Sequence, residues 1–501
     1  MVSEIVEHFV SGKPWTGSSE RLSDVYDPNR GTVQRRVRLG MPSDVDEVVE
    51  VSAAAQREWA AWNPQRRARV LMRFLTLANE QMDELAALLS SEHGKTLPDA
   101  RGDIQRGLEV IEFATGAPHL LKGEYSTDAG PGVDVYSMRQ PLGVVAAITP
   151  FNFPAMIPLW KIGPALACGN AVVLKPSERD PSVPVRIAEM FVEAGLPPGV
   201  LNVVHGDKEV VDALLVHPDI AAVGFVGSTP IAEHVYSTAT AHGKRAQCFG
   251  GAKNHLLVLP DADMDQAADA LTGAAWGSAG QRCMAISVAV PVGEQTADLL
   301  VAKLAERARN LTVGRSDSET ADLGPLVGAD ADERVRRAIQ AGVDEGAELV
   351  VDGREVGAPE GGDGGWFMGG SLFDRVTTVM SLYRDEIFGP VLSVVRAANY
   401  DEALRVANGH RYGNGVAIFT RDGDAARDFA SKVETGMVGV NVPIPVPIAY
   451  HTFGGWKASG FGDLNQHGPD SFKFYTRTKT VTSRWPSGIK DGASFVIPTM
   501  S

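Results

Sequence analysis

The sequence predicts an α/β protein with two lobes, each built on a largely parallel sheet. Between residues 143 and 249, short apolar and β-branched runs alternate with stretches of helical periodicity. A second series of the same kind begins at His255 and continues to about Gly439. Repeated βα units favour parallel strands covered by helices, and such sheets bind ligands at the carboxyl ends of their strands.

Length and composition are typical of a globular enzyme. The chain has 501 residues, which allows two to four domains at roughly 100 to 200 residues each. The net charge of −15 opposes binding to nucleic acids and anionic membranes. The N-terminal residues lack a targeting pattern, and no apolar stretch approaches the roughly 18 to 20 residues that span a bilayer. We therefore expect a cytoplasmic protein with no nucleic-acid or membrane partner.

Two helices are predicted before the first strand series. Apolar residues recur at helical spacing after Ser43, whose hydroxyl we expect to cap a first helix. One apolar stripe over residues 64–93 predicts a single longer helix, which Gly94 ends.

The strands of both lobes follow from the apolar runs. We expect strands at 143–149, 171–174, 201–204, 221–226 and 245–249 in the first lobe, and at 256–259, 286–290, 391–395 and 415–419 in the second. A helix over 185–194 should end at Gly195, and the Gly-rich stretch 357–370 is expected to be a surface loop. Polar and apolar residues alternate at 134–139 and 472–482, which suits a small third element able to pair with another subunit.

The three cysteines should be free thiols, because their spacing suits neither a disulfide framework nor a metal site. Cys168 and Cys248 fall in buried helix and strand patterns. Cys283 lies among small residues just before an apolar strand. A thiol is intrinsically nucleophilic even at a pKa of about 8.5, but spacing alone leaves both a nucleophile and an inert core residue open.

The signals for nucleotide binding are incomplete by themselves. Neither GxGxxG nor GxxxxGK[ST] is present. Gly227 and Ser228 lie between a strand and a helix, where free amides bind pyrophosphate, although Gly and Ser also serve turn geometry alone. Lys175 and Glu178 follow another strand and would hold ribose hydroxyls or form an ordinary solvent-facing ion pair.

Five motifs, in this order, resemble those of the aldehyde dehydrogenase superfamily over essentially the whole chain. They are Thr149-Pro-Phe-Asn-Phe-Pro154, Gly163-Pro-Ala-Leu-Ala-Cys-Gly-Asn170, Phe225-Val-Gly-Ser228, Gly280-Gln-Arg-Cys283 and Glu386-Ile-Phe-Gly-Pro390. The resemblance implies an aldehyde dehydrogenase-like fold with a Rossmann-type NAD-binding lobe, an α/β catalytic lobe and a small β oligomerisation element. The implied division assigns residues 1–123 and 141–249 to NAD binding, 250–440 to catalysis, and 124–140 with 441–501 to the oligomerisation element and C-terminal arm.

The resemblance also implies residue roles. Cys283 would be the nucleophile, and Asn152 with the Cys283 amide would form the oxyanion hole. The positions that match cofactor contacts for NAD are Thr149, Phe151, Lys175, Glu178, Arg179, Gly227, Ser228, Gly250, Glu386 and Phe388. No metal is implied.

The chain departs from the hydrolytic members of the superfamily at one position. Those members have a Glu-Leu-Gly-Gly-Lys stretch whose carboxylate activates water, whereas this chain has Cys248-Phe-Gly-Gly-Ala-Lys-Asn-His255. Phe249 takes the place of the Glu, and no neighbouring register restores a carboxylate. Water attack should be slow without a general base, while a thiol acceptor needs less help. This stretch, with Asn441-Val-Pro-Ile-Pro-Val-Pro447, resembles the CoA-acylating methylmalonate semialdehyde dehydrogenases.

That closer resemblance implies substrates and partners. The substrates would be malonate semialdehyde and methylmalonate semialdehyde, with coenzyme A as co-substrate and acetyl-CoA or propionyl-CoA and CO2 as products. Arg106 and Arg282 match positions that bind the substrate carboxylate, although Arg106 alone reads as a solvated helix charge. Assembly as a homotetramer, a dimer of dimers, is also implied.

Two alternatives remain at this stage. One is a hydrolytic semialdehyde dehydrogenase that uses another base. The other is a non-catalytic protein that kept the fold, which would normally have lost Cys283 or Asn152.

Overall fold

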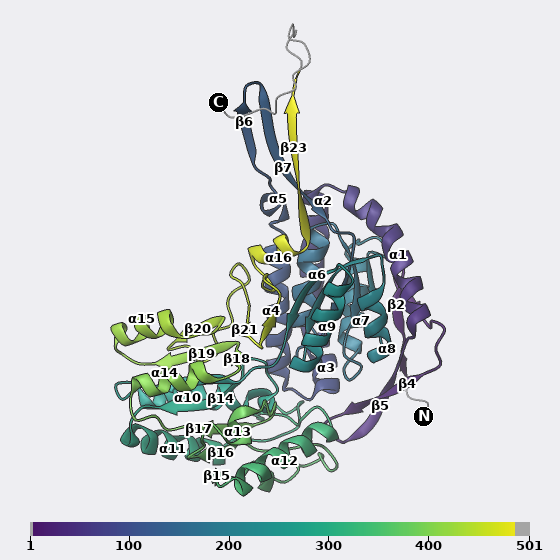
Figure 1. The fold of residues 1–501 in the computed structure, drawn as a ribbon. Helices are drawn as coiled ribbons and strands as arrows, with labels where there is room; N and C mark the ends of the chain where they lie inside the picture. The colour runs from purple at the N-terminus through teal and green to yellow at the C-terminus, as the bar shows by residue number, and fades with distance from the viewer. Residues whose placement is uncertain (1–3, 486–501) are drawn as a thin grey trace.

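An eight-stranded sheet organises the larger lobe of the computed structural model, which describes residues 4–485 (Figure 1). Its order is β22-β12-β11-β8-β9-β10-β2-β3, and the five central strands are parallel. The strands are β2 (His8–Val10), β3 (Lys13–Trp15), β8 (Val144–Ile148), β9 (Ala171–Lys175), β10 (Leu201–Val203), β11 (Ile220–Val226), β12 (Arg245–Phe249) and β22 (Gly460–Phe461). The five strands predicted for this lobe are confirmed.

Side chains of the central strands alternate between two hydrophobic clusters, one on each face of the sheet. Along β8, Val145 and Ala147 pack into one cluster, whereas Val144, Ala146 and Ile148 pack into the other. Both faces are buried, which explains why these strands read as continuous apolar runs. The helices associated with this lobe are α1 (Pro42–Ala61), α2 (Pro64–Glu80), α3 (Met82–His93), α4 (Leu97–Ala114), α5 (Ala117–Leu120), α6 (Met156–Ala167), α7 (Ser182–Glu193), α8 (Lys208–Val216), α9 (Thr229–Ala241) and α16 (Pro469–Phe474).

The second lobe holds a seven-stranded sheet in the order β15-β16-β17-β14-β13-β19-β20, with β15 antiparallel to its neighbour. Its strands are β13 (Asn254–Val258), β14 (Ile286–Pro291), β15 (Glu348–Val351), β16 (Ser371–Asp374), β17 (Val391–Val394), β19 (Gly415–Phe419) and β20 (Met437–Val440). Its helices are α10 (Met264–Trp276), α11 (Glu294–Arg309), α12 (Ala329–Asp344), α13 (Ser381–Arg384), α14 (Tyr400–Gly409) and α15 (Gly423–Lys432). The four strands predicted here are confirmed, with shifts of one or two residues at some ends.

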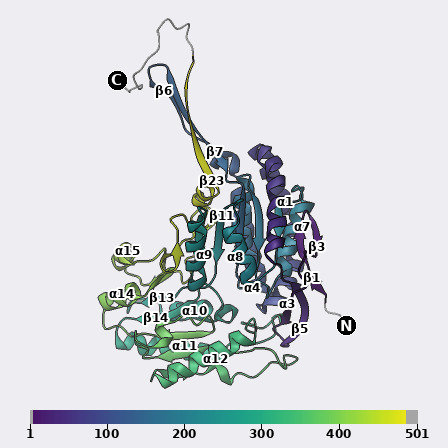
Figure 2. The same ribbon diagram turned by 45° about the vertical axis from the view of Figure 1, so that its right-hand side comes forward.

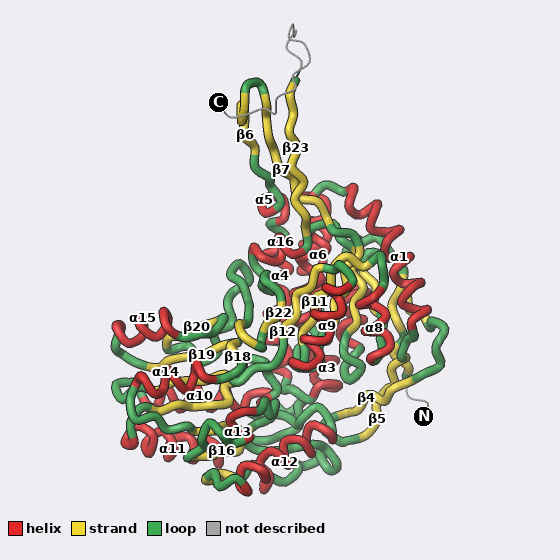
Figure 3. The backbone as a smooth tube through the Cα atoms, in the orientation of Figure 1, coloured by secondary structure: helices red, strands yellow, loops and turns green. Residues whose placement is uncertain are grey.

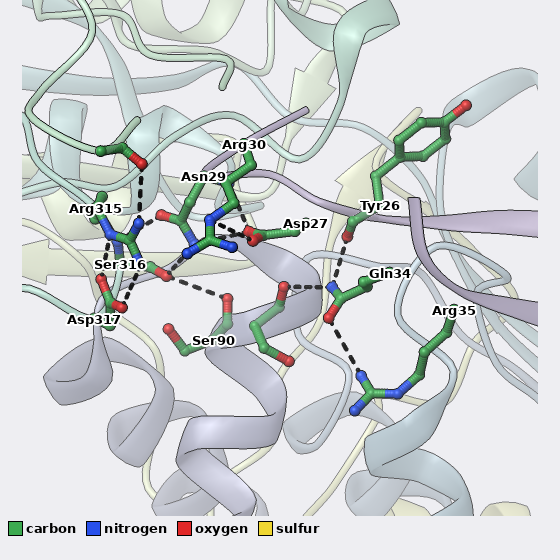
Figure 4. Close-up of polar contacts among 12 residues, drawn as sticks. Tyr26, Asp27, Asn29, Arg30, Gln34, Arg35, Ser90, Arg315, Ser316 and Asp317 are labelled. Atoms are coloured by element: carbon green, nitrogen blue, oxygen red, sulfur yellow. Dashed lines mark hydrogen bonds and ion pairs between the residues drawn. The ribbon is translucent and has the colours of Figure 1, made fainter. Parts of the chain in front are cut away.

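Two segments connect the lobes. The hairpin of β4 (Leu22–Asp27) and β5 (Thr32–Arg38) runs from the first lobe toward the second (Figure 3). At its tip the Asn29 amide donates to Ser316 Oγ at 3.0 Å, and the Ser316 N–H donates to Asn29 Oδ1 at 2.8 Å (Figure 4). In the other direction, β22 from the C-terminal part of the chain pairs with β12 in the first sheet.

A three-stranded sheet projects from the body as an arm (Figures 1 and 2). It consists of β6 (Tyr125–Gly130), β7 (Val133–Pro141) and β23 (Thr476–Arg484), in the order β23-β7-β6. The predicted third element is therefore present. Its second strand was expected from residue 472, but residues 469–474 form α16 and the strand begins at Thr476.

Two helix predictions were wrong in detail. Ser43 lies inside α1, because Pro42 occupies the first turn and the Met41 N–H donates to Asp44 Oδ2 at 2.9 Å. The stripe over 64–93 is two helices, α2 and α3, separated at Gln81. Both helices bury apolar residues in the same cluster, so periodicity could not reveal a one-residue break. Gly94 ends α3 with φ 91°, as predicted.

The Gly-rich stretch 357–370 is only partly a surface loop. Its first residues are exposed, but Phe367 and Met368 are 4% and 1% exposed. Within residues 4–485, no helix is long and apolar enough to cross a membrane, and no group of three or more His, Cys, Asp or Glu side chains is arranged to hold a metal ion.

Candidate active site

The candidate site lies where the carboxyl-terminal edge of the first sheet meets the amino-terminal edge of the second. Chain segments that leave β8, β11 and β12 face the segments that enter β14 and β17. Together they enclose a cavity of about 390 Å³. Its lining residues are Pro150, Phe151, Asn152, Val226, Gly227, Ser228, Gly250, Gly251, Cys283, Arg334, Glu386 and Phe388.

A strained turn brings Cys283 to this cavity. After α10, Ser278, Ala279 and Gly280 all adopt left-handed backbone conformations, with φ of 53°, 50° and 69°. This conformation is unfavourable for Ser and Ala, and a Cβ at Gly280 would collide with the Gly389 carbonyl. The strain is therefore stored beside the nucleophile candidate, where surrounding packing holds it in place.

Two asparagine side chains hold the Cys283 backbone. The Asn254 amide donates to the Cys283 carbonyl at 3.0 Å, and the Asn414 amide donates to the same oxygen at 3.2 Å. Asn254 in turn accepts a hydrogen bond from the Gly415 N–H at 3.0 Å. The starts of β13 and β19 thus fix the cysteine relative to the second sheet. Sequence reasoning assigned neither asparagine a role.

The surroundings of Cys283 favour the protonated form of its thiol. Burial raises its pKa to about 12, and the negative charge of Glu386 acts in the same direction. Backbone N–H groups and Lys95 oppose this shift only in part. Below this pKa the thiol form predominates. Cys168 and Cys248 are 1% and 0% exposed, so the prediction that both belong to the core is confirmed.

Asn152 offers an uncommitted hydrogen-bond donor to the cavity. The residue is 3% exposed, and its side chain forms no hydrogen bond with any other residue in 4–485. Its backbone carbonyl accepts a hydrogen bond from Lys95 Nζ at 2.8 Å. Because Asn152 and Cys283 line the same cavity, this amide can face an oxygen on a carbon attached to the cysteine sulfur.

The glycines in the lining let neighbouring protein segments pack closely around the cavity. A Cβ at Gly250 would lie 2.8 Å from Thr229 Oγ1 and 2.9 Å from the Ala458 carbonyl. A Cβ at Gly251 would collide with Glu386. Ser228 precedes α9, and its side chain caps none of the amides at that helix start. Pro230 has no N–H and the Ile231 N–H donates to the Ser228 carbonyl at 3.1 Å, so Ser228 and Thr229 supply the amides that this helix start can offer to a phosphate group.

Two aromatic rings and one carboxylate complete the same wall. Phe151 and Phe388 meet edge to face at 5.9 Å between ring centroids, and Phe388 adopts a left-handed φ of 56°. Glu386 accepts a hydrogen bond from the Ala252 N–H at 2.9 Å, and burial raises the pKa of its carboxyl group. Six of the ten predicted cofactor positions therefore line the cavity: Phe151, Gly227, Ser228, Gly250, Glu386 and Phe388.

The other four predicted cofactor positions follow β8 and β9 outside the lining set. The Thr149 N–H donates to the Lys175 carbonyl at 3.1 Å, and Lys175 Nζ lies 3.3 Å from Glu178. Arg179 forms a two-point ion pair with Asp330, at 2.9 and 2.7 Å. Its guanidinium group is thus tied to α12.

Phe249 occupies the sequence position at which the resemblance would place the catalytic Glu of a hydrolytic aldehyde dehydrogenase. It ends β12, is 5% exposed, and packs 6.1 Å from the Phe453 ring in an apolar cluster that Cys283 also contacts. Glu386 is the one carboxylate among the described residues that line the cavity.

The two predicted carboxylate-binding arginines have different surroundings. Arg282 adjoins Cys283, forms an ion pair with Asp99 at 2.7 Å, and lines a recess of about 20 Å³ beside the main cavity. Arg106 is outside both linings. Its guanidinium group forms an ion pair with Glu109 at 2.6 Å and donates to the Pro447 carbonyl at 2.7 Å. The group is therefore already bound to the loop around residue 447.

Arg334 is a lining residue that sequence reasoning missed. It comes from α12 and donates through Nε to the Ile387 carbonyl at 3.3 Å. Its helix is rich in charged residues, and no motif distinguishes Arg334 from its solvent-facing neighbours.

Comparison with known proteins decides the family. The model of the aldehyde dehydrogenase family matches residues 15–481. The chain belongs to the aldehyde dehydrogenase family. The resemblance inferred from the five motifs and the predicted α/β fold class are thereby confirmed.

Similar members of the aldehyde dehydrogenase family carry semialdehyde names. A malonate-semialdehyde dehydrogenase from Pseudomonas aeruginosa is 53% identical over 496 residues, which cover 99% of each chain. A solved Sinorhizobium meliloti protein, assigned as a methylmalonate-semialdehyde dehydrogenase and complexed with NAD, is 63% identical with a TM-score of 0.96, covering 98% of this chain and 100% of that one. A methylmalonate-semialdehyde dehydrogenase from Oceanimonas doudoroffii is 50% identical with a TM-score of 0.95, covering 97% and 99%.

Proposed function

We propose that this aldehyde dehydrogenase oxidises malonate semialdehyde and methylmalonate semialdehyde with NAD and passes the acyl group to coenzyme A. The products are acetyl-CoA or propionyl-CoA, CO2 and NADH. The observation that carries the proposal is that Cys283 and Asn152 line one cavity, while the adjoining apolar cluster that Cys283 packs against holds Phe249 at the sequence position expected for a water-activating carboxylate. The names of the similar proteins support the same substrates.

In the first step Cys283 loses its proton to solvent, and the resulting thiolate attacks the aldehyde carbon. A C–S bond forms, and the aldehyde oxygen becomes an alkoxide. The Asn152 side-chain amide and the Cys283 N–H donate hydrogen bonds to that oxygen. Donors already in place stabilise the charge as it develops, at no cost of reorganisation.

Oxidation converts this adduct into a thioester on Cys283. NAD, when bound, accepts the hydride that leaves the former aldehyde carbon. Gly227, Ser228 and Gly250 line the cavity and would hold the cofactor there, with Ser228 and the start of α9 as the groups that would bind its phosphates. Glu386 and Phe388 shape the wall next to the nucleophile. Glu178, near Lys175, is the proposed partner of a ribose hydroxyl.

Release of the thioester determines the product. Water needs a general base, and Phe249 supplies none, while Glu386, the carboxylate that lines the cavity, is assigned to the cofactor. The thiol of coenzyme A deprotonates much more readily than water and attacks the thioester carbonyl. The acyl group then leaves on coenzyme A, and the Cys283 sulfur is freed. The substrate carboxylate leaves as CO2 before or after this transfer, and the carbon that carried it takes up one proton, which balances the proton released by the coenzyme A thiol.

Recognition of the substrate carboxylate falls to Arg282 and Arg106. A guanidinium group binds a carboxylate through two parallel hydrogen bonds. Arg282 is next to the nucleophile and retains further N–H groups beyond its contact with Asp99. Arg106 would exchange its bond to the Pro447 carbonyl for the substrate, which requires a small shift of that loop.

The remaining proposals concern how the chain is divided into domains. The NAD-binding domain comprises residues 1–123 and 141–249, and the catalytic domain comprises residues 250–440. The oligomerisation element and arm comprise residues 124–140 and 441–501, of which residues 486–501, like residues 1–3, lie outside the described part. Strand β22, within the last range, pairs in the first sheet, so only part of that range belongs to the arm. The enzyme works as a homotetramer in the cytoplasm.

A steady-state assay tests the proposed function. NADH formation is followed with malonate semialdehyde and NAD, with and without coenzyme A, and the product is identified by mass. We expect turnover that requires coenzyme A and yields acetyl-CoA. Equal turnover without coenzyme A, with a free acid as product, would instead identify a hydrolytic dehydrogenase.

A further inference from the structure

We propose that Lys95 and Asp103 form a buried ion pair that positions Asn152 for catalysis. The inference rests on the proposed role of Asn152 as an oxyanion donor. Both charged side chains are 0% exposed, and Lys95 Nζ lies 3.0 Å from Asp103 Oδ2. Neither residue lines the cavity, so both would act through Asn152 rather than on the substrate.

Lys95 and Asp103 each form a hydrogen bond with one end of the segment 152–156. Lys95 Nζ donates to the Asn152 carbonyl at 2.8 Å and lies 4.1 Å above the Phe153 ring. Asp103 Oδ1 accepts a hydrogen bond from the Met156 N–H at 2.7 Å. The backbone from the Asn152 carbonyl to the Met156 N–H is therefore fixed by Lys95, which precedes α4, and by Asp103 on α4.

Helix α4 also contacts Arg282, the residue next to the nucleophile. Asp99 and Asp103 are four residues apart and share one face of the helix. Asp99 holds Arg282, the residue before Cys283, at 2.7 Å. Burial opposes ionisation of Asp99, but Lys95 and Arg282 outweigh it and lower the pKa of this carboxyl group. One helix thus contacts the residue before Cys283 and the segment that follows Asn152.

The position of Lys95 is itself fixed by packing. Gly94 adopts φ 91°, and a Cβ there would lie 3.0 Å from side-chain atoms of both Pro28 and Pro325. The Leu97 N–H donates to the Ser316 carbonyl at 3.3 Å. The turn that carries Lys95 is therefore enclosed by the hairpin tip and the second lobe.

Energetics favour a positioning role over a purely stabilising one. Moving two charges out of water is costly, and replacing such a pair by well-packed apolar residues is often neutral. What apolar residues cannot supply is the pair of hydrogen bonds to the Asn152 carbonyl and the Met156 amide. A misplacement of about 1 Å in a reacting group costs on the order of a hundredfold in rate.

Three variants test the inference. Lys95→Met removes the bond to Asn152, and Lys95→Met/Asp103→Asn does so without leaving a buried lone charge. Arg101→Met is the control, since it removes an exposed ion pair with Asp83 from the same helix. The readouts are the rate of the NADH burst, KM for NAD and the melting temperature. We expect the burst rate to fall by about ten- to a hundredfold in both Lys95 variants, with KM for NAD within about twofold.

The double variant separates positioning from stability. We expect it to regain most of the melting temperature lost by Lys95→Met while its burst rate stays low. Recovery of both quantities together would overturn the inference, because the pair would then serve stability alone. The Arg101→Met variant should match the unmodified enzyme in both readouts.

A double-mutant cycle separates this inference from the proposed function. If Lys95 acts through Asn152, Lys95→Met should cost little more in an Asn152→Ala background. Additive losses would overturn the inference alone. An unchanged burst rate in Asn152→Ala by itself would overturn the proposed role of Asn152.

Discussion

At the residue scale, the environment of Cys283 opposes thiolate formation. Burial is the main cause of the raised pKa, and the nearby carboxylate of Glu386 adds to it. A thiol with a pKa of about 12 gains thiolate tenfold with each pH unit across the neutral and alkaline range. Reactivity of the free enzyme should therefore follow pH steeply.

Alkylation measures this directly. We expect the rate of Cys283 alkylation by iodoacetamide to rise about tenfold per pH unit between about pH 7 and 10, without a plateau. Glu386→Gln removes a charge that raises the thiol pKa, so it should speed alkylation at fixed pH. Cys168 and Cys248 serve as internal controls, because both are buried and should stay unlabelled. A plateau near pH 8 would contradict the burial argument.

Phe249 gives the second prediction at this scale. Phe249→Glu places a carboxylate in an apolar cluster, which raises its pKa toward the range of a useful base. We expect turnover without coenzyme A to increase by at least about tenfold, with a free acid as product. Phe249→Gln, of similar size but without a base, should not show the increase. Equal gains in both variants would point to altered packing instead.

Some site residues could be predicted and others could not. Cys283, Asn152 and Phe249 stand in motifs, so resemblance identified them before any geometry was known. Asn414 and Arg334 lie outside every matched motif and reach the site only because distant segments fold together. Local sequence carries no signal for such contacts.

At the element scale, strands were easier to predict than helix ends. The runs that form β8, β9, β11 and β12 are buried on both faces and stand out in composition. Helix ends depend on single hydrogen bonds, such as that of Met41 to Asp44, which favoured a different cap from Ser43. The hairpin tip at Asn29 gave no signal, because its partner Ser316 is 287 residues away.

The hairpin contact yields a prediction. Asn29→Ala removes the acceptor of the buried Ser316 N–H and the donor to its hydroxyl, which should cost about 1 to 3 kcal/mol locally. We expect faster hydrogen exchange in residues 312–325, measured by mass spectrometry, with the cavity residues little affected. Ser318→Ala, at an exposed hydroxyl in the same loop, is the matched control. Unchanged exchange would show that the contact does not hold the lobes together.

At the scale of the whole molecule, the arm has an open edge. Strand β23 pairs with β7 on one side only among the described residues, and Tyr125 on β6 is 65% exposed. An unpaired strand edge on a projecting sheet is a ready partner for another chain. This is the structural support for the proposed tetramer.

Removal of the last arm strand tests the assembly. We expect the full chain to elute as four chains by size-exclusion chromatography with light scattering. Truncation before Thr476 removes β23 and should yield smaller species, because the exposed edge is lost. A tetrameric truncated chain, or a monomeric full chain, would contradict the role of the arm.

The central claim is that the thioester on Cys283 waits for coenzyme A because no base activates water. The most direct test is the intact mass of the enzyme after mixing with NAD and malonate semialdehyde in the absence of coenzyme A. We predict an acyl adduct on the peptide that contains Cys283, stable on the timescale of turnover and discharged as acyl-CoA when coenzyme A is added. An enzyme that stays unmodified while free acid accumulates would contradict the account.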